Sequence, residues 1–186
     1  MGIEQKILPA IRNMKDFEKL LDSNYEYLVL LDSHISQLRS ITQTAKRHGK
    51  KLLVHVDLIQ GLKNDEHAAA FLAQDIKVDG VISTRASVIM TAKKKGVLAI
   101  QRLFLLDSSA LKKSYALLEK TQPDYIEVLP GIMPEIITEV HEKTGIPIFA
   151  GGLVRTVEDV ENALSAGATA ATTSRASLWK HFVIGM

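Results

Sequence analysis

The sequence predicts an α/β fold in which eight short buried strands alternate with helices. Apolar runs without polar alternation recur along the chain, and such runs are typical of parallel strands that are buried on both faces. Segments with apolar residues at helical spacing separate these runs. Eight such strands favour a compact (β/α)8 barrel, the TIM barrel, with short loops and a truncated final helix. An open doubly wound sheet is the alternative.

The predicted strands are short apolar runs, most of which end in a polar residue or a glycine. Turn or helix signals follow each run, which limits the strand length. In chain order the strands cover residues 7–11, 27–31, 52–57, 80–84, 97–103, 125–129, 147–150 and 168–172.

The predicted helices are bounded by residues that commonly begin or end a helix. Thr156 and either Asp107 or Ser108 can accept a hydrogen bond at a helix start, and Pro134 suits a first helical position. Gly49 stands where a helix C-cap is expected. The helices cover residues 16–21, 35–45, 66–74, 88–95, 110–120, 134–145 and 157–166, and a shorter one follows the last strand.

The composition fits a single domain over residues 1–186, because 46% of the residues are apolar. The chain has no cysteine, which excludes disulfides and thiolate metal sites and agrees with a reducing cytosol. The N-terminus lacks the apolar core of a signal peptide, and no apolar run has membrane-spanning length. We therefore expect a cytoplasmic protein without membrane contact. The net charge of +2 does not by itself indicate nucleic-acid binding.

The ends of the seventh and eighth strands predict a phosphate site. Gly151 and Gly152 follow one strand, and Thr173 and Ser174 follow the other. Backbone N–H groups beside glycines, hydroxyls and the start of the next helix can bind an anion. In TIM barrels the loops after these two strands frequently hold phosphate. A tight turn alone would also account for the glycine pair.

Charged residues stand at six other predicted strand ends, where a barrel would bring them to one mouth. The arginines could reach a phosphate or a hydroxyl, and the carboxylates could accept hydrogen bonds from a polyol. Alternatively, these residues pair with one another and fill the barrel interior. They are Arg12, Asp32, Asp57, Arg85, Arg102 and Glu127.

Asp57 and Glu127 also permit an enzymatic hypothesis, because two carboxylates in one mouth can divide acid and base work. No lysine stands at a predicted strand end, so Schiff-base chemistry has no candidate. His55 lies two residues before Asp57 on the same side of the strand and is predicted one layer below it, either as a core residue or with a ligand-binding or catalytic role. The other histidines form no metal-ligand cluster with carboxylates in the sequence.

A short internal similarity supports two related half-barrels. Residues 84–87 (Thr-Arg-Ala-Ser) follow the fourth strand, and residues 174–177 (Ser-Arg-Ala-Ser) follow the eighth. Chance similarity is the alternative for so short a repeat. The lysine runs, such as residues 93–95, have no interleaved aromatics and are predicted to be solvated surface, so these residues alone do not indicate RNA.

Motifs at most strand ends resemble those of one bacterial family, the glycerol-uptake operon antiterminators. The similarity runs almost end to end and in the same order. Its motifs are Ala-Ile-Arg-Asn at residues 10–13, His-Val-Asp-Leu at 55–58, Ile-Ser-Thr-Arg at 82–85, Ile-Gln-Arg at 100–102, Ile-Glu-Val-Leu-Pro-Gly at 126–131, Ala-Gly-Gly-Leu at 150–153, and Thr-Ser at 173–174 with Leu-Trp at 178–179.

This resemblance implies a regulator without catalytic residues, metal or cofactor. Members of the family respond to glycerol 3-phosphate and bind the leader mRNA of glycerol-utilisation operons, which prevents premature termination. The resemblance assigns phosphate contacts to Gly151, Gly152 and Ser174, and we add Thr173 and Arg175 beside them. Arg175 lies where the family pattern leaves the residue open, and Thr172 stands where serine is expected. The remaining pocket would be lined by Arg12, Asp57, Arg85, Arg102 and Glu127.

Three hypotheses follow. The leading one is a regulator that binds glycerol 3-phosphate in the barrel mouth and then leader mRNA. The second is a small phosphosugar or glycerol-phosphate enzyme that uses Asp57 and Glu127. The third is a ligand-binding module that acts through protein contacts. A homo-oligomer is compatible with each, and the RNA-binding surface is not located by any motif.

Overall fold

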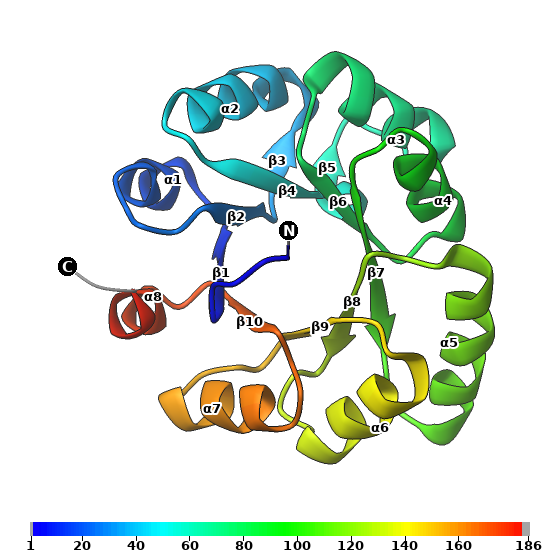
Figure 1. Ribbon diagram of the computed structural model, residues 1–186. Helices are drawn as coiled ribbons and strands as arrows, with labels where there is room; N and C mark the ends of the chain where they lie inside the picture. The colour runs from blue at the N-terminus through cyan, green and yellow to red at the C-terminus, as the bar shows by residue number, and fades with distance from the viewer. Residues whose placement is uncertain (1, 184–186) are drawn as a thin grey trace.

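The computed structural model describes residues 2–183 and contains a closed barrel of eight parallel strands surrounded by helices (Figure 1). Around the barrel the strands follow the order β1-β10-β9-β8-β7-β6-β4-β2. Each barrel strand therefore pairs with the strands before and after it along the chain, and β10 closes the ring against β1. The predicted (β/α)8 barrel is confirmed.

The barrel strands are the predicted apolar runs, and nearly every residue in them is buried. The first and sixth runs have the predicted bounds, and the others differ by one or two residues. The strands are β1 (Ile7–Ile11), β2 (Tyr27–Leu30), β4 (Lys51–His55), β6 (Gly80–Ser83), β7 (Leu98–Phe104), β8 (Tyr125–Leu129), β9 (Ile148–Gly151) and β10 (Ala170–Thr173).

Five of the helices, α1, α2, α3, α5 and α7, begin at a side chain that accepts a backbone hydrogen bond. Thr156 and Asp159 form a reciprocal capping box, and Asp107 accepts from the Ala110 N–H at 2.8 Å. Asn13 accepts from the Asp16 N–H, so the first helix starts two residues before the predicted position. The helices are α1 (Met14–Leu21), α2 (Ile35–Arg47), α3 (Glu66–Phe71), α4 (Ala86–Lys94), α5 (Ser108–Thr121), α6 (Pro134–Thr144), α7 (Val157–Ser165) and the short α8 (Ala176–Phe182).

Two predicted elements have different ends. The third strand was expected to reach Asp57, but β4 stops at His55 and η1 (Val56–Leu58) turns the chain. The chain then adds a two-stranded sheet of β3 (Ser33–His34) and β5 (Ile59–Gln60), which the sequence did not predict. The predicted helix 66–74 continues from α3 into the π-helical turn η2 (Leu72–Ile76).

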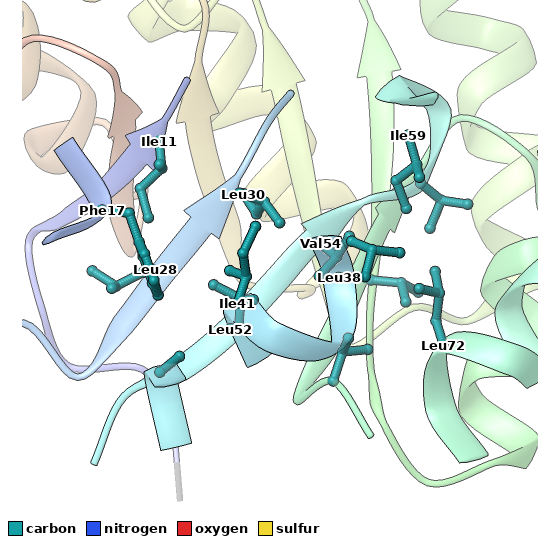
Figure 2. Close-up of a cluster of buried hydrophobic side chains, with 14 of the residues drawn as sticks. Ile11, Phe17, Leu28, Leu30, Leu38, Ile41, Leu52, Val54, Ile59 and Leu72 are labelled. Atoms are coloured by element: carbon teal, nitrogen blue, oxygen red, sulfur yellow. The ribbon is translucent and has the colours of Figure 1, made fainter. Parts of the chain in front are cut away.

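Alternate residues of each strand face two different apolar layers. One layer lies between the strands and the outer helices. Figure 2 shows part of it, where Phe17 of α1 and Leu38 and Ile41 of α2 pack near strand residues such as Leu28 and Leu52. The other layer fills the barrel interior and is formed by Ile3, Leu8, Ala10, Tyr27, Val29, Leu53, Ile82, Ile100, Tyr125, Phe149 and Ala170.

The N-terminal segment closes the barrel end at which the strands begin. The Ile3 N–H donates to the Tyr125 hydroxyl at 3.0 Å, and the Gln5 side chain exchanges hydrogen bonds with the Tyr27 backbone. The Phe149 ring stacks on Tyr125 at 4.5 Å between centroids. Because this end is filled, polar side chains gather at the opposite end. Within the described residues, no helix combines the length and apolar character needed to cross a bilayer.

The interior packing gives a test of the fold. Phe149 is fully buried, whereas Phe104 is 50% exposed at the end of β7. We expect Phe149→Ala to lower the free energy of unfolding by about 3–5 kcal/mol, the usual cost of deleting a buried aromatic ring. Phe104→Ala should cost less than about 1 kcal/mol, as is typical of exposed positions. Urea unfolding followed by circular dichroism measures both, and equal losses would contradict this account of the core.

Candidate functional site

A pocket of about 250 Å³ opens at the barrel end where the strands terminate. It suits a small metabolite, because pockets for drug-sized ligands usually start near 300 Å³. Its charged and hydroxyl-bearing lining comes from β1, β7, β8, β10 and the loops that follow β9 and β10. These polar residues are Arg12, Arg102, Glu127, Arg155, Thr172, Thr173, Ser174 and Arg175.

Strand alternation explains why several of these side chains meet. Arg102 follows Ile100 on the interior side of β7, and Glu127 follows Tyr125 on the same side of β8. The two residues are also in register across the β7–β8 pair. Thr172 and Ser174 continue the interior side of β10 beyond Ala170. The layer above the apolar interior is therefore polar.

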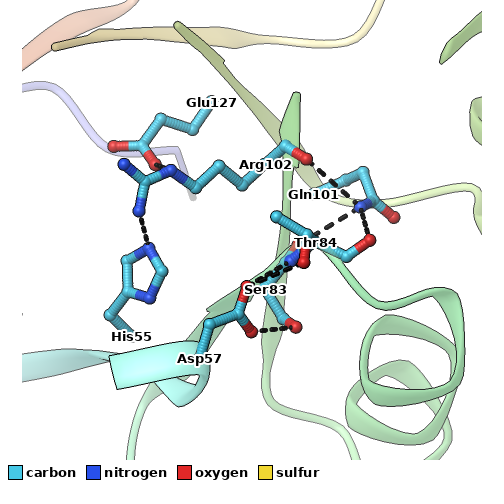
Figure 3. Close-up of polar contacts among 7 residues, drawn as sticks. All are labelled: His55, Asp57, Ser83, Thr84, Gln101, Arg102 and Glu127. Atoms are coloured by element: carbon cyan, nitrogen blue, oxygen red, sulfur yellow. Dashed lines mark hydrogen bonds and ion pairs between the residues drawn. The ribbon is translucent and has the colours of Figure 1, made fainter. Parts of the chain in front are cut away.

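Arg102 and Glu127 form a buried ion pair at the pocket floor (Figure 3). Arg102 Nε lies 3.5 Å from Glu127 Oε2, and neither atom has a hydrogen-bond partner in the described chain. Burial raises the pKa of Glu127, and the charge of Arg102 and the nearby Thr172 hydroxyl oppose that rise. The hydroxyl oxygen of Thr172 is also buried without a partner. These groups can receive hydrogen bonds from, or donate them to, a bound polar molecule.

His55 lies below this pair, on the interior side of β4. An Arg102 N–H group contacts His55 Nε2, so Nε2 accepts and the ring is neutral. Burial first, and then the nearby Arg102 charge, lower the pKa of His55 to about 4. His55 does not line the pocket. His55 is therefore a core residue in contact with Arg102, which was one of the alternatives predicted from the sequence.

Asp57 does not line the pocket, contrary to the expectation from the sequence. Its carboxylate accepts from Ser83 Oγ at 2.5 Å and from the Thr84 N–H and hydroxyl, each at 2.9 Å (Figure 3). Asn64 donates a fourth hydrogen bond at 2.7 Å. Burial alone would raise the pKa of Asp57, but these hydrogen bonds outweigh it and hold the pKa below its usual value. The turn after β4 directs the carboxylate to β6.

The ends of β6 and β10 have similar local structures, which supports the short internal similarity. The Arg85 N–H donates to Ser83 Oγ at 3.0 Å, and the Arg175 N–H donates to Thr173 Oγ1 at 3.2 Å. Both arginines precede a helix with extended backbone angles. Thr84 and Ser174 therefore occupy equivalent positions in the fourth and eighth strands of the barrel.

The two ends differ in what faces the equivalent residues. In the first, Asp57 stands two residues after β4 and occupies the donors of Thr84. In the second, the position two residues after β9 is Leu153, which has no carboxylate. Among the described residues Ser174 has no hydrogen-bond partner, and it lines the pocket. An anion-binding arrangement that is filled internally at β6 is therefore open at β10.

The glycines after β9 make room for this site. A Cβ on Gly151 would lie 2.8 Å from Glu127 Oε1, so a side chain here would displace the carboxylate. Gly152 and Leu153 both have left-handed backbone angles, with φ of 73° and 60°. Gly152 lines the pocket, whereas Gly151 acts through Glu127. Strain at a non-glycine residue such as Leu153 is common in functional loops.

The structure brings together seven of the ten predicted site residues as pocket lining: Gly152, Thr173, Ser174, Arg175, Arg12, Arg102 and Glu127. Arg85 and Asp57 do not line the pocket, and Arg85 is exposed to solvent. Asp32 pairs with Arg12 at 3.5 Å in solvent. The predicted site residues did not include Thr172 or Arg155, which also line the pocket. Strand alternation along β10 could have indicated Thr172, and the position of Arg155 in the loop after Gly151 and Gly152 could have indicated Arg155.

The described residues contain no group of three or more histidine and carboxylate side chains arranged to hold a metal ion. The site can instead hold a small anion with several hydroxyls. Its lining offers guanidinium groups, hydroxyls, a backbone turn at glycine and one buried carboxylate.

Residues 7–179 match the model of a family described as the glycerol-3-phosphate responsive antiterminators. The chain belongs to this family. The glycerol uptake operon antiterminator regulatory protein of Listeria monocytogenes is 49% identical, with a TM-score of 0.92 over 95% of each chain. An antiterminator-related protein of Thermotoga maritima is 30% identical, with a TM-score of 0.84 over 95% of this chain and 98% of that chain.

This chain is also similar to an uncharacterized protein of Escherichia coli. The protein YgcP of strain K12 is 34% identical over 176 residues, which are 95% of this chain and 92% of YgcP. The resemblance noted in the strand-end motifs is thus confirmed. The family is one of regulators, and its fold is the barrel described above.

The buried His55 of this antiterminator family member predicts a pH dependence of stability. The folded state keeps the ring neutral down to about pH 4, whereas an unfolded histidine takes up a proton near pH 6.5. The contribution of His55 is therefore present above pH 6.5 and is lost as the pH falls toward 4. We expect this loss to be about 3 kcal/mol.

Urea unfolding of the native protein and of His55→Gln between pH 7 and pH 4 tests this point. Glutamine can still accept from Arg102 but does not titrate. The difference in stability between the two proteins should shrink, or reverse, by about 3 kcal/mol across this range. A difference that stays constant with pH would contradict the assignment.

Proposed function

We propose that this protein binds glycerol 3-phosphate in the barrel mouth and, when occupied, binds the leader mRNA of glycerol-utilisation operons as an antiterminator. One observation carries the proposal. At the end of β10, Ser174 and two arginines face an open pocket, where the equivalent β6 position is filled by the Asp57 carboxylate. A ligand phosphate takes the place that the Asp57 carboxylate takes in the first half of the barrel.

The phosphate would lie among Gly152, Ser174, Arg155 and Arg175. Two guanidinium groups match the charge of a phosphate monoester, and hydroxyl and backbone N–H donors are common partners of its oxygens. Within the described residues, Arg175 forms no ion pair, so its charge is available to a ligand. Thr173 supports this arrangement by accepting the Arg175 N–H.

The glycerol hydroxyls would lie deeper, against Glu127, Thr172 and Arg102. Glu127 Oε2 and Thr172 Oγ1 are buried acceptors without partners, and a ligand hydroxyl can donate to either. This contact would relieve the cost of leaving the carboxylate incompletely bonded. Both parts of the molecule then have complementary groups at opposite ends of one small pocket.

The geometry favours a regulator over the enzyme alternative. That alternative requires Asp57 and Glu127 to share the work, but Asp57 is fully engaged with β6 and Asn64. Glu127 is the one carboxylate among the described residues that line the pocket. Membership in a regulatory family supports the same choice. For regulation, the ligand must bind the RNA-competent state more tightly than the other state.

Arg175 and Arg85 provide a matched pair of variants for effector binding. Arg175→Ala should weaken glycerol 3-phosphate binding about tenfold to one-hundredfold, because it deletes a charge-assisted hydrogen bond to phosphate. Arg85→Ala alters the equivalent residue outside the pocket and should leave affinity within about twofold, a change well under 1 kcal/mol. Isothermal titration measures both. Fluorescence of Trp179, whose indole N–H donates to the Thr173 carbonyl at 2.8 Å, gives a second readout.

Equal losses in the two variants would refute the proposed phosphate position. For the output, a gel-shift titration with leader RNA should show higher affinity at saturating glycerol 3-phosphate. Unchanged affinity would refute ligand-gated RNA binding. Conversion of glycerol 3-phosphate into a product that stops in Glu127→Gln would favour the enzyme alternative.

A further inference from the structure

The exposed large apolar side chains of the described chain are concentrated on one face. Met14, Leu58, Phe104, Leu106, Ile132 and Leu153 are between 39% and 75% exposed. Each stands at the end of a barrel strand or in the segment after one, so all six lie at the end of the molecule where the pocket opens. Single exposed apolar residues are normal, but several neighbouring ones at one end of a barrel indicate an interaction surface.

Four of these residues come from three adjacent strands. Phe104 ends β7 and Leu106 follows it, Ile132 follows β8, and Leu153 follows β9. The backbone holds these segments together, because the Leu105 N–H donates to the Leu129 carbonyl at 2.9 Å and the Gly131 N–H donates to the Gly152 carbonyl at 3.0 Å. We call Phe104, Leu106, Ile132 and Leu153 the apolar rim.

Phe104 connects the apolar rim to the pocket floor. It lies two residues beyond Arg102 on the same side of β7, and the guanidinium carbon of Arg102 is 5.1 Å from its ring centroid. This distance is that of a cation–π contact. One face of the ring is thus supported by an arginine, while half of the Phe104 surface remains exposed.

The charges beside the apolar rim are mainly guanidinium groups. Arg155 and Arg175 line the pocket opening, and Arg12 lies across it, paired with Asp32 in solvent. Two carboxylates of this end are turned inward, because Glu127 is 4% exposed and Asp57 is bonded to β6, whereas Asp107 and Asp32 are exposed. An apolar aromatic surface beside unpaired positive charge is the combination that holds unpaired bases and their phosphates.

We infer that the apolar rim is the RNA-binding surface, with Phe104 as a platform on which an unpaired base of single-stranded RNA stacks. This inference rests on the proposed function, which supplies RNA as the partner, and it adds the surface and the route of regulation. A second copy of the chain is a poorer occupant. A two-fold symmetric contact through this face would bring the arginines of one copy toward those of the other.

The same contacts couple the rim to the effector. An effector hydroxyl would bind Glu127, which pairs with Arg102. Arg102 in turn packs against the Phe104 ring. Effector occupancy therefore fixes Arg102 and with it the platform, whereas an empty pocket leaves the Arg102–Glu127 contact at 3.5 Å without a hydrogen bond. The coupling requires that the effector favour the ordered platform.

Filter binding of a leader transcript from the glycerol-uptake operon of the same genome tests the inference at saturating glycerol 3-phosphate. Phe104→Ala should weaken RNA binding about tenfold or more, since base–aromatic stacking commonly has this effect. Phe104→Tyr keeps the ring and should bind within about threefold of the native protein, because stacking depends on the ring face. Met14→Ala removes an exposed apolar side chain after β1, on the opposite side of the barrel from β7, and should bind normally.

Isothermal titration without RNA separates the two proposals. The native protein and Phe104→Ala should both bind glycerol 3-phosphate, with affinities within about threefold, since the ring does not line the pocket. Unchanged RNA binding by Phe104→Ala, or equal losses in Phe104→Ala and Met14→Ala, would overturn the inference and leave the proposed function standing. A native dimer that Phe104→Ala converts to monomers would overturn it in favour of a second copy. Failure of the native protein to bind the transcript at any effector concentration would refute the proposed function and, with it, this inference.

Discussion

The buried contact between Arg102 and Glu127 is the interaction on which the site depends. Two charges in a barrel interior cost free energy unless hydrogen bonds satisfy them, and here the closest approach of Nε to Oε2 is 3.5 Å. Gly151 leaves space for the carboxylate, and His55 accepts from the arginine below. The barrel thus holds a polar floor in which Arg102 Nε and Glu127 Oε2 lack hydrogen-bond partners among the described residues. An incompletely bonded floor is expected where a ligand supplies the missing groups.

The two halves of the barrel use similar strand ends for different purposes. After β6, the hydroxyl and N–H groups of Thr84 bind Asp57, which fixes the turn after β4. After β10, Ser174 stands at the equivalent position and faces an open pocket. One half therefore stabilises the fold with an internal carboxylate, and in the other half we propose that an external anion binds the corresponding donors. The two strand ends differ in one side chain, because Leu153 stands where the first half of the barrel has Asp57.

Strand periodicity predicted most of the fold. The first and sixth strands and the helix caps at Asp107 and Thr156 follow directly from apolar runs and capping chemistry. The β3–β5 sheet was not predicted, because each strand has two residues and gives no periodic signal. The prediction that Asp57 faces the barrel mouth was also wrong. It relied on strand alternation continuing to Asp57, but η1 turns the chain before that residue.

Strand alternation also predicted part of the candidate site. Residues on straight strand ends, such as Arg102 and Glu127, could be placed by alternation, and the structure puts them in the pocket. Residues whose role depends on a turn or on exposure could not. In the sequence Phe104 is one more apolar residue of a predicted strand. Only the structure shows that its ring is half exposed and packs against Arg102.

A crystal structure of the complex with glycerol 3-phosphate tests the central claim most directly. The account predicts phosphate oxygens within hydrogen-bonding distance of Ser174 and the Gly152 N–H, with Arg155 and Arg175 beside them. It also predicts a glycerol hydroxyl bonded to Glu127 Oε2 or Thr172 Oγ1. A phosphate bound elsewhere, such as beside Arg85, or a ligand that leaves Glu127 and Thr172 without new hydrogen bonds, would contradict it.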